Sequence, residues 1–357
     1  MNRMNRIPVG DALLGRVIDA TGAPLDNRGP IDATTQLPID RPVGADVSAL
    51  PDQMLETGVK VIDLYAPIRR GGTVPMIAGS GVGKVVVSNE LIQRVATRRD
   101  GRAVMAFLDH PTYGMAELVA DLRSSGMERH AALLVGQPDD SQLVRDKLGL
   151  AALTLAESFC DQGRETLLFM EENLVSDQTV ERFLARPHGD TRAALTILLW
   201  QHDPPIMPAG AQVYSRLLRD GDGQLVFSRA LAKQSIWPAI DPVRSTSRLL
   251  SGQALAAEHV RVARAARELL RDYGDLEDAG AAGDDARLRA RARRVLLFGS
   301  QPFVVTETFT AVPGVYVPVS ETVRGYGELV DGRHDDVPEE AFRFGGGLEE
   351  ALGKASG

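Results

Sequence analysis

The sequence predicts an α/β fold, in which helices cover both faces of a parallel sheet, followed by a mainly helical region. Two observations carry this prediction. Between about Val59 and Trp200, continuously apolar runs of strand length alternate with amphipathic helical patterns. After Ser251 the strand-like runs stop and helical periodicity takes over. We therefore expect an α/β domain over residues 1–250 and a helical domain over residues 251–357.

Predicted elements follow one another along the chain. The first 35 residues surround short β-branched runs with Gly, Pro and Asp, which predicts short strands and turns. Apolar runs predict strands at 74–78, 103–108, 131–136, 166–170 and 194–200. Trp200 ends the last of these runs. Helical patterns lie at 85–99, 115–126 and 144–163, then in EHVRVARAARELLRDY and DDARLRARARRVLLF, with a closing acidic helix near Pro338–Lys354.

The composition excludes several classes of protein. Of the 357 residues, 44% are hydrophobic and 25% charged, which argues against a disordered or fibrous protein. No run approaches about 18 uninterrupted apolar residues, so we expect no membrane-spanning helix. A single cysteine, Cys160, excludes an intramolecular disulfide and a Cys-based zinc site. The net charge of −8 argues against a protein that coats nucleic acid.

A glycine-rich stretch, AGSGVGK at 78–84, lies between a predicted strand and a predicted helix. Gly79, Gly81 and Gly83 allow the backbone to turn with its N–H groups pointing inward, where the helix dipole adds its positive end. Lys84 can then reach terminal phosphates as a point charge. The stretch therefore predicts a phosphate-binding loop. The alternative is an ordinary strand-to-helix turn with an exposed lysine.

This loop departs from the full phosphate-binding pattern, Gly-X-X-X-X-Gly-Lys followed by Ser or Thr. Ala78 replaces the first glycine, which is a mild change. Val85 replaces the hydroxyl residue that normally binds Mg²⁺, and its side chain has no oxygen. The strand TLLFMEE at 166–172 supplies Glu171 where a carboxylate commonly holds the water shell of the metal. Val85 therefore argues against Mg²⁺ and leaves Glu171, acting through water, as the candidate metal ligand.

Six segments, in order, resemble the β subunits of F-type ATP synthases from about Pro8 to the end of the sequence. They are PVGDALLGRVIDATGAPLDNRGPI (8–31), ETGVKVIDLYAPIRRGG (56–72), AGSGVGK (78–84), LTLAESFCDQGRETLLFMEEN (153–173), FSRALAKQSIWPAIDPVRSTSRL (227–249) and SQPFVVTETFTAVPG (300–314). Any one segment is a weak signal, whereas six in the same order are specific. The resemblance implies a truncated, degenerate β-like paralogue. Its RecA-like P-loop core has a mostly parallel sheet over residues 1–250 and precedes the helical domain.

The same resemblance implies the residues of a nucleotide site. Lys84 matches the phosphate-binding lysine, and Arg186 matches the arginine that contacts the γ-phosphate. Trp237, Phe303 and Phe309 match aromatic walls of the adenine pocket, and base stacking is reasonable chemistry for such rings. ATP or ADP is the expected ligand. The implied nucleotide-binding residues are Gly79, Ser80, Gly81, Val82, Gly83, Lys84, Val85, Trp237, Phe303 and Phe309, and the implied catalytic residues are Lys84, Glu171 and Arg186.

Other positions of the family pattern are replaced. Where the family carries Gly-Glu-Arg after its third core strand, this sequence has Asp109, His110 and Pro111. The family's glutamate positions the attacking water, and losing such a group costs ~10²–10⁴ in rate. Three parts are also expected to be missing or shortened: the N-terminal β-barrel, part of the core after Arg186, and the acidic lever loop, reduced to AGAAGDD at 279–285. The resemblance thus leaves open whether the chain turns over ATP.

The function that the resemblance implies is a nucleotide-binding, β-like subunit of a rotary ATP synthase or ATPase. Such a hydrolase or translocase couples ATP synthesis to proton transport, and here the chain's own catalytic site is impaired. Its partners would be α-like and γ-like subunits in a hetero-hexameric ring, with neither nucleic acid nor direct membrane insertion. Two locations are open, the cytoplasm or the periphery of the inner membrane through a synthase complex. Two alternatives also stay open: a non-catalytic paralogue acting as an interaction protein outside the motor, and a related ring ATPase such as a type III secretion motor.

Overall fold

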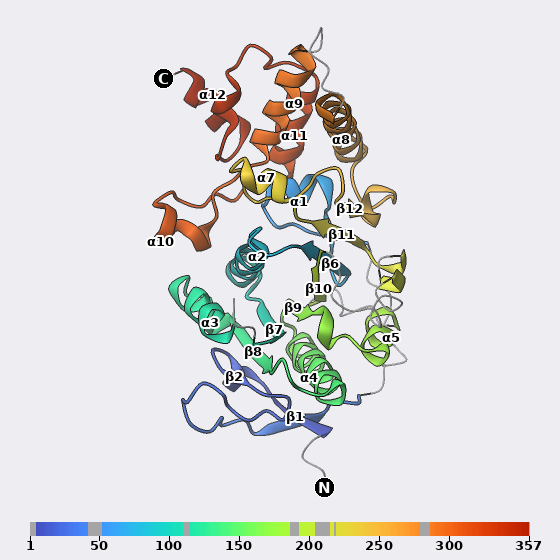
Figure 1. The fold of residues 1–357 in the computed structure, drawn as a ribbon, viewed down its shortest axis with the longest axis vertical. Coiled ribbons are helices and arrows are strands. Elements are labelled where there is room, and N and C mark those ends of the chain that lie inside the picture. The colour runs from blue at the N-terminus through green and yellow to red at the C-terminus, as the bar shows by residue number, and fades with distance from the viewer. Residues whose placement is uncertain are drawn as a thin grey trace. The chain divides into compact units, whose positions relative to one another are not determined.

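The computed structural model describes residues 5–41, 52–109, 114–185, 193–203, 215–217, 219–278 and 286–356. The chain forms two compact units. Unit 1 comprises Met1–Gln53, Arg69–Ile77 and Lys84–Asp222, and unit 2 comprises Met54–Ile68, Ala78–Gly83 and Gly223–Gly357. In Figure 1 the colour follows the chain from blue at the N-terminus to red at the C-terminus.

Unit 1 is built on a sheet whose strands lie in the order β6-β10-β9-β7-β8-β2. The pairs β10–β9, β9–β7, β7–β8 and β8–β2 are all parallel. The predicted, mostly parallel sheet is therefore confirmed. The strand bounds are β2 Val17–Ile18, β6 Thr73–Ala78, β7 Arg102–Leu108, β8 Ala131–Gly136, β9 Thr166–Glu171 and β10 Leu195–His202.

The central strands are apolar along their length because helices cover both faces of the sheet. β7 and β9 bury every residue except the first of β7. Figure 1 shows α2 (Lys84–Arg99) and α3 (Met115–Ser124) on one side of these strands, and α4 (Gln142–Asp161) and α5 (Asp177–Ala185) on the other. This α/β arrangement is consistent with a RecA-like nucleotide-binding domain.

The N-terminal segment of unit 1 contains the short strands that the turn-rich sequence predicts. β1 (Arg6–Val9) pairs antiparallel with β3 (Thr35–Pro38). Ile7 is fully buried and, with Leu13 and Ile18, joins the apolar core that includes Phe159 of α4. These residues tie the N-terminal segment to the sheet through shared hydrophobic packing.

Unit 2 is mainly helical. Phe298 is buried in it, edge-on to Tyr326 with ring centroids 4.9 Å apart and to Phe342 with centroids 6.4 Å apart. The predicted C-terminal helical region is confirmed. The elements are β4 Met54–Leu55, α1 Lys60–Tyr65, β5 Ile68–Arg69 (its first residue), β11 Gly223–Val226, α7 Arg229–Lys233, β12 Thr246–Ser247, α8 Ala257–Asp278, α9 Ala286–Phe298, α10 Glu307–Thr310, α11 Val319–Val330 and α12 Leu348–Ser356.

The closing helix predicted near Pro338–Lys354 is wrong as a single element. The structure has a short 3₁₀ helix at Glu339–Phe342 and then α12 from Leu348. The three glycines at 345–347 lie between them, and glycine disfavours a helix by about 1 kcal/mol relative to alanine. α11 was not among the predicted helices, although its sequence VSETVRGYGELV buries one face. No helix in the described part of the chain is both long and apolar enough to cross a membrane.

Candidate functional site

The glycine-rich loop connects β6 to α2, as predicted. Gly81 and Gly83 have φ values of +72° and +85°, a backbone conformation that side chains with a Cβ rarely adopt. No atom lies within 4 Å of the position that a Cβ on Gly81 would take. The first N–H groups of α2 follow directly, and the N-terminus of a long helix attracts anions. The local backbone therefore has the features that a phosphate-binding loop needs.

Arg229, at the start of α7, is a loop contact that the sequence reasoning missed. Its guanidinium donates a hydrogen bond of 2.8 Å to the backbone carbonyl of Ser80. Both side chains are exposed. This contact holds the loop backbone and adds a positive charge beside it. The sequence could not predict this contact, because Arg229 lies 149 positions beyond Ser80 and no motif spacing links the two.

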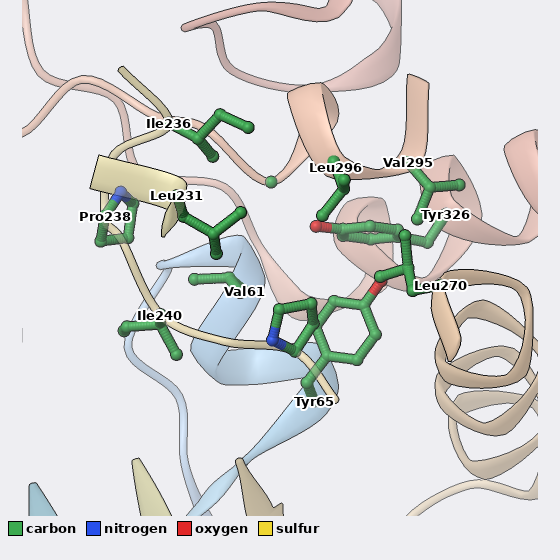
Figure 2. Close-up of a pocket in the computed structure, with 12 residues that line it drawn as sticks. Val61, Tyr65, Leu231, Ile236, Pro238, Ile240, Leu270, Val295, Leu296 and Tyr326 are labelled. Carbon is green, nitrogen blue, oxygen red and sulfur yellow. The ribbon is translucent and has the colours of Figure 1, made fainter. Parts of the chain in front are cut away.

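Trp237 lies against the same loop within unit 2. A Cβ on Gly83 would be 3.1 Å from the indole Cζ3, so a larger residue would require the ring to move by a few tenths of an ångström. The carbonyl of Trp237 accepts a hydrogen bond of 2.8 Å from the Gln301 backbone N–H. Its neighbours Ile236 and Pro238 line a small cavity (Figure 2) and anchor the segment. The structure thus places Trp237, half-buried, beside the phosphate-loop backbone.

The cavity in Figure 2 is not an adenine pocket. The centre of a water molecule can occupy only about 10 Å³ of this cavity, which is room for roughly one water. The rings of Tyr65 and Tyr326 meet edge to face in its wall, with centroids 5.5 Å apart. The remaining walls are almost entirely apolar. The lining residues are Val61, Tyr65, Leu231, Ile236, Pro238, Ile240, Pro242, Leu270, Val295, Leu296, Gly299 and Tyr326.

Phe303 and Phe309 differ in exposure. Phe303 is buried, whereas Phe309 in α10 is 72% exposed, an unusual state for so large an apolar side chain. No ring contact joins either phenylalanine to Trp237 within the described part of the chain. The structure therefore does not bring the three rings into one stack. Phe309 is left with its surface open to a ligand.

Lys84, the first residue of α2, lies in unit 1 beside an aromatic ring. Its Nζ is 5.4 Å from the ring centroid of Trp200, within cation–π range. Among the residues that the structure describes, this ammonium makes no hydrogen bond and no ion pair. Burial lowers the pKa of Lys84, and the charges of Glu171 and Glu172 oppose that shift. Its three N–H donors therefore remain available to a ligand.

Glu171 ends β9 and is buried, with both carboxylate oxygens engaged. Oε2 accepts a hydrogen bond of 2.9 Å from the Leu108 backbone N–H, and Oε1 accepts one of 3.4 Å from Asn173. The side chain of Val85 has no oxygen. These residues do not fit a Mg²⁺ ion, which prefers several oxygen ligands in octahedral geometry. Within the described ranges, no group of three or more His, Cys, Asp or Glu residues could hold a metal ion.

Several predicted positions lie outside the described residues. They are His110, Pro111, Arg186 and the shortened lever loop at 279–285. Asp109 is described, and its carboxylate accepts a hydrogen bond of 2.8 Å from the Met115 backbone N–H at the start of α3. This contact gives Asp109 a helix-capping role.

Comparison with known protein families supports the nucleotide site. Residues 58–178 match the ATP synthase alpha/beta family, nucleotide-binding domain. The match includes the glycine-rich loop, Lys84, Val85 and Glu171, whereas Trp237, Phe303 and Phe309 lie beyond it. It supports the alpha/beta family in general, without separating its subunits, and with it binding of ATP or ADP.

Proposed function

We propose that this chain is an ATP- or ADP-binding, β-like subunit of an F-type rotary ATP synthase or ATPase, and that its own catalytic site is impaired. One observation carries the proposal. A glycine-rich loop that matches the family's nucleotide-binding domain leads into Lys84, whose ammonium has no hydrogen-bond partner in the described part of the chain. A partly buried cation with unused donors at a helix N-terminus fits a polyphosphate.

The residues of the proposed site divide between phosphates and base. The backbone of Gly79–Gly83 and the Lys84 ammonium would bind the phosphates, and Arg186 would add a charge at the γ-phosphate. Trp237 is proposed to stack on the adenine, because its half-buried ring lies against the loop at Gly83. Phe303 and the exposed Phe309 are proposed as further walls of the base site.

The proposed site binds nucleotide with little dependence on Mg²⁺. The side chain of Val85 has no oxygen, and the oxygens of Glu171 accept hydrogen bonds from within the protein. Glu171 would at most contact a metal through water. The attraction between the loop and the phosphate oxygens does not require the metal.

Impaired catalysis follows from the groups that are replaced. Phosphoryl transfer depends on positioned charges and an oriented nucleophile. His110 and Pro111 stand where the family has a water-positioning glutamate and an arginine, so both contributions are lost. We therefore propose that hydrolysis by this chain is negligible, and that its partners are α-like and γ-like subunits in a hetero-hexameric ring.

A steady-state phosphate-release assay tests this function, with the chain alone and mixed with α subunits. We expect ATP binding by calorimetry without turnover. Turnover near 1 s⁻¹ or above from the unmodified chain, the low end of ordinary enzymes, would contradict the impaired site. Binding of ATP without stable association with α and γ subunits would favour the alternative of a non-catalytic interaction protein outside the motor. That alternative draws its support from the replacements at Val85, His110 and Pro111.

A further inference from the structure

Trp200 lies at the carboxyl end of β10, opposite Glu171 of β9 in the register of the sheet. Its side chain is buried, with 5% of its surface exposed. The indole is also the ring over which the Lys84 ammonium lies, at 5.4 Å from its centroid. A buried aromatic ring thus contacts the residue proposed to bind phosphate.

The indole of Trp200 is held from several sides. Its ring centroid is 6.3 Å from that of Phe107 and 6.2 Å from that of Phe169. Its Nε1 donates a hydrogen bond of 3.0 Å to Ser88 Oγ. The Ser88 hydroxyl in turn donates one of 3.0 Å to the backbone carbonyl of Lys84. The ring is therefore fixed, and the long Lys84 side chain is the part of this contact that is able to move.

Lys84 has only weak stabilisation in this position. The carboxylates of Glu171 and Glu172 attract it electrostatically, yet neither forms an ion pair with it among the described residues. The ring face supplies no hydrogen-bond acceptor for the three N–H groups. A phosphate group offers both a full negative charge and several acceptor oxygens. Transfer of the ammonium from the ring to a phosphate is therefore favourable.

We propose that Trp200 is a positioning residue that holds the Lys84 ammonium on its indole face while the loop is empty and releases it when a phosphate group binds. The inference rests on the proposed nucleotide site. It adds that the indole ring and the phosphate compete for the Lys84 ammonium. Anion binding must break the cation–π contact, so Trp200 weakens the affinity for phosphates. It also places a fluorescent reporter at the lysine.

Fluorescence tests the movement directly, because the chain has only two tryptophans. Trp237→Phe leaves Trp200 as the single emitter. We expect its emission to change on saturation with ATP and equally with inorganic tripolyphosphate, which has no base. In the absence of ligand, Lys84→Met in the same background is expected to shift the emission in the same direction, because it removes the cation and keeps the stem. Unchanged Trp200 emission at ligand saturation, established by calorimetry, would overturn the inference.

Affinity tests the competition separately. Trp200→Leu and the milder Trp200→Phe are both expected to bind tripolyphosphate more tightly, the former by about 2–5-fold, the usual worth of a cation–π contact. Lys233→Ala in α7 removes an exposed charge that takes no part in the Trp200 contact, so it is the control and should bind tripolyphosphate as the wild type does. Weaker binding by the folded Trp200 variants would overturn the proposal. Failure of the wild type to bind either anion would instead refute the nucleotide site itself.

Discussion

Two lysines of this chain, Lys60 in unit 2 and Lys84 in unit 1, occupy environments that are alike in two respects. Each ammonium lies over an aromatic ring, Lys60 at 4.3 Å from the Phe298 centroid and Lys84 at 5.4 Å from that of Trp200. Burial lowers the pKa of both, that of Lys60 to about 7. Both therefore carry an electrostatic cost that something else in the molecule must offset.

The two lysines differ in what their N–H groups do. Lys60 Nζ donates hydrogen bonds of 2.7 Å to the carbonyls of Gly345 and Gly346, whereas Lys84 Nζ donates none within the described residues. Lys60 thus ties α1 to the segment before α12 and serves the fold. Lys84 keeps its donors for a ligand. Burial alone does not distinguish a structural lysine from a binding one, but the use of its donors does.

The largest effect is expected at Lys60. Lys60→Ala leaves two carbonyls without their donor and opens a cavity, which should lower the free energy of unfolding by about 3 kcal/mol or more. Lys60→Met restores most of the volume and should cost less. Urea denaturation measures both variants. A Lys60→Ala protein as stable as the wild type would show that Lys60 does not stabilise the fold.

Lys84→Ala, in contrast, should change ligand binding and leave stability nearly unchanged. Loss of a charged donor to phosphate is expected to weaken ATP binding by roughly 10–100-fold, with little change in the urea midpoint. Lys233→Ala in α7 removes the same charge from an exposed side chain and is the control. Calorimetry gives the affinities. Equal ATP affinities for the two variants would show that Lys84 is not a phosphate ligand.

Gly81 and Gly83 both have positive φ, but only Gly83 contacts Trp237, so substitutions at the two positions distinguish backbone strain from the loss of that contact. Gly81→Ala and Gly83→Ala should each cost about 1–2 kcal/mol, because the left-handed conformation is unfavourable for alanine. Gly83→Ala should cost more and weaken ATP binding further, since its Cβ would lie 3.1 Å from Trp237. Chemical denaturation and ATP titration measure the difference. Identical behaviour of the two variants would show that the Trp237 contact has no part in binding.

A smaller effect is expected from pH. Phosphate binds the charged form of Lys84, and burial lowers its pKa, so this charge is lost at lower pH than for an ordinary lysine. ATP affinity should therefore fall between pH 7 and 9.5 by less than about tenfold. Lys84→Arg stays charged throughout and should bind with a flat profile. A flat profile for the wild type as well would mean that the lysine does not titrate in this range.

Local sequence signals predicted much of the fold. The predicted strand at 131–136 has the bounds of β8, and α2 begins within one residue of its predicted start. Both elements are determined by local signals, because apolar runs and helix- or strand-ending glycines depend only on neighbouring residues. Contacts between distant residues were beyond such signals. Lys60 and Gly345 are 285 positions apart, and Trp200 meets Ser88 across 112 positions through the order of the strands. Trp200 ends a predicted strand and lies in β10, yet its contact with Lys84 depends on the folded sheet.

Calorimetric titration of ATP into the wild type, with Mg²⁺ and then with EDTA, tests most directly whether this loop binds nucleotide without the metal. Val85→Thr is the matched control, because it restores the hydroxyl that commonly binds Mg²⁺ and should gain affinity only when the ion is present. The account predicts wild-type dissociation constants in the two conditions that agree within tenfold, or about 1.4 kcal/mol. A larger loss of wild-type affinity on chelation would contradict it.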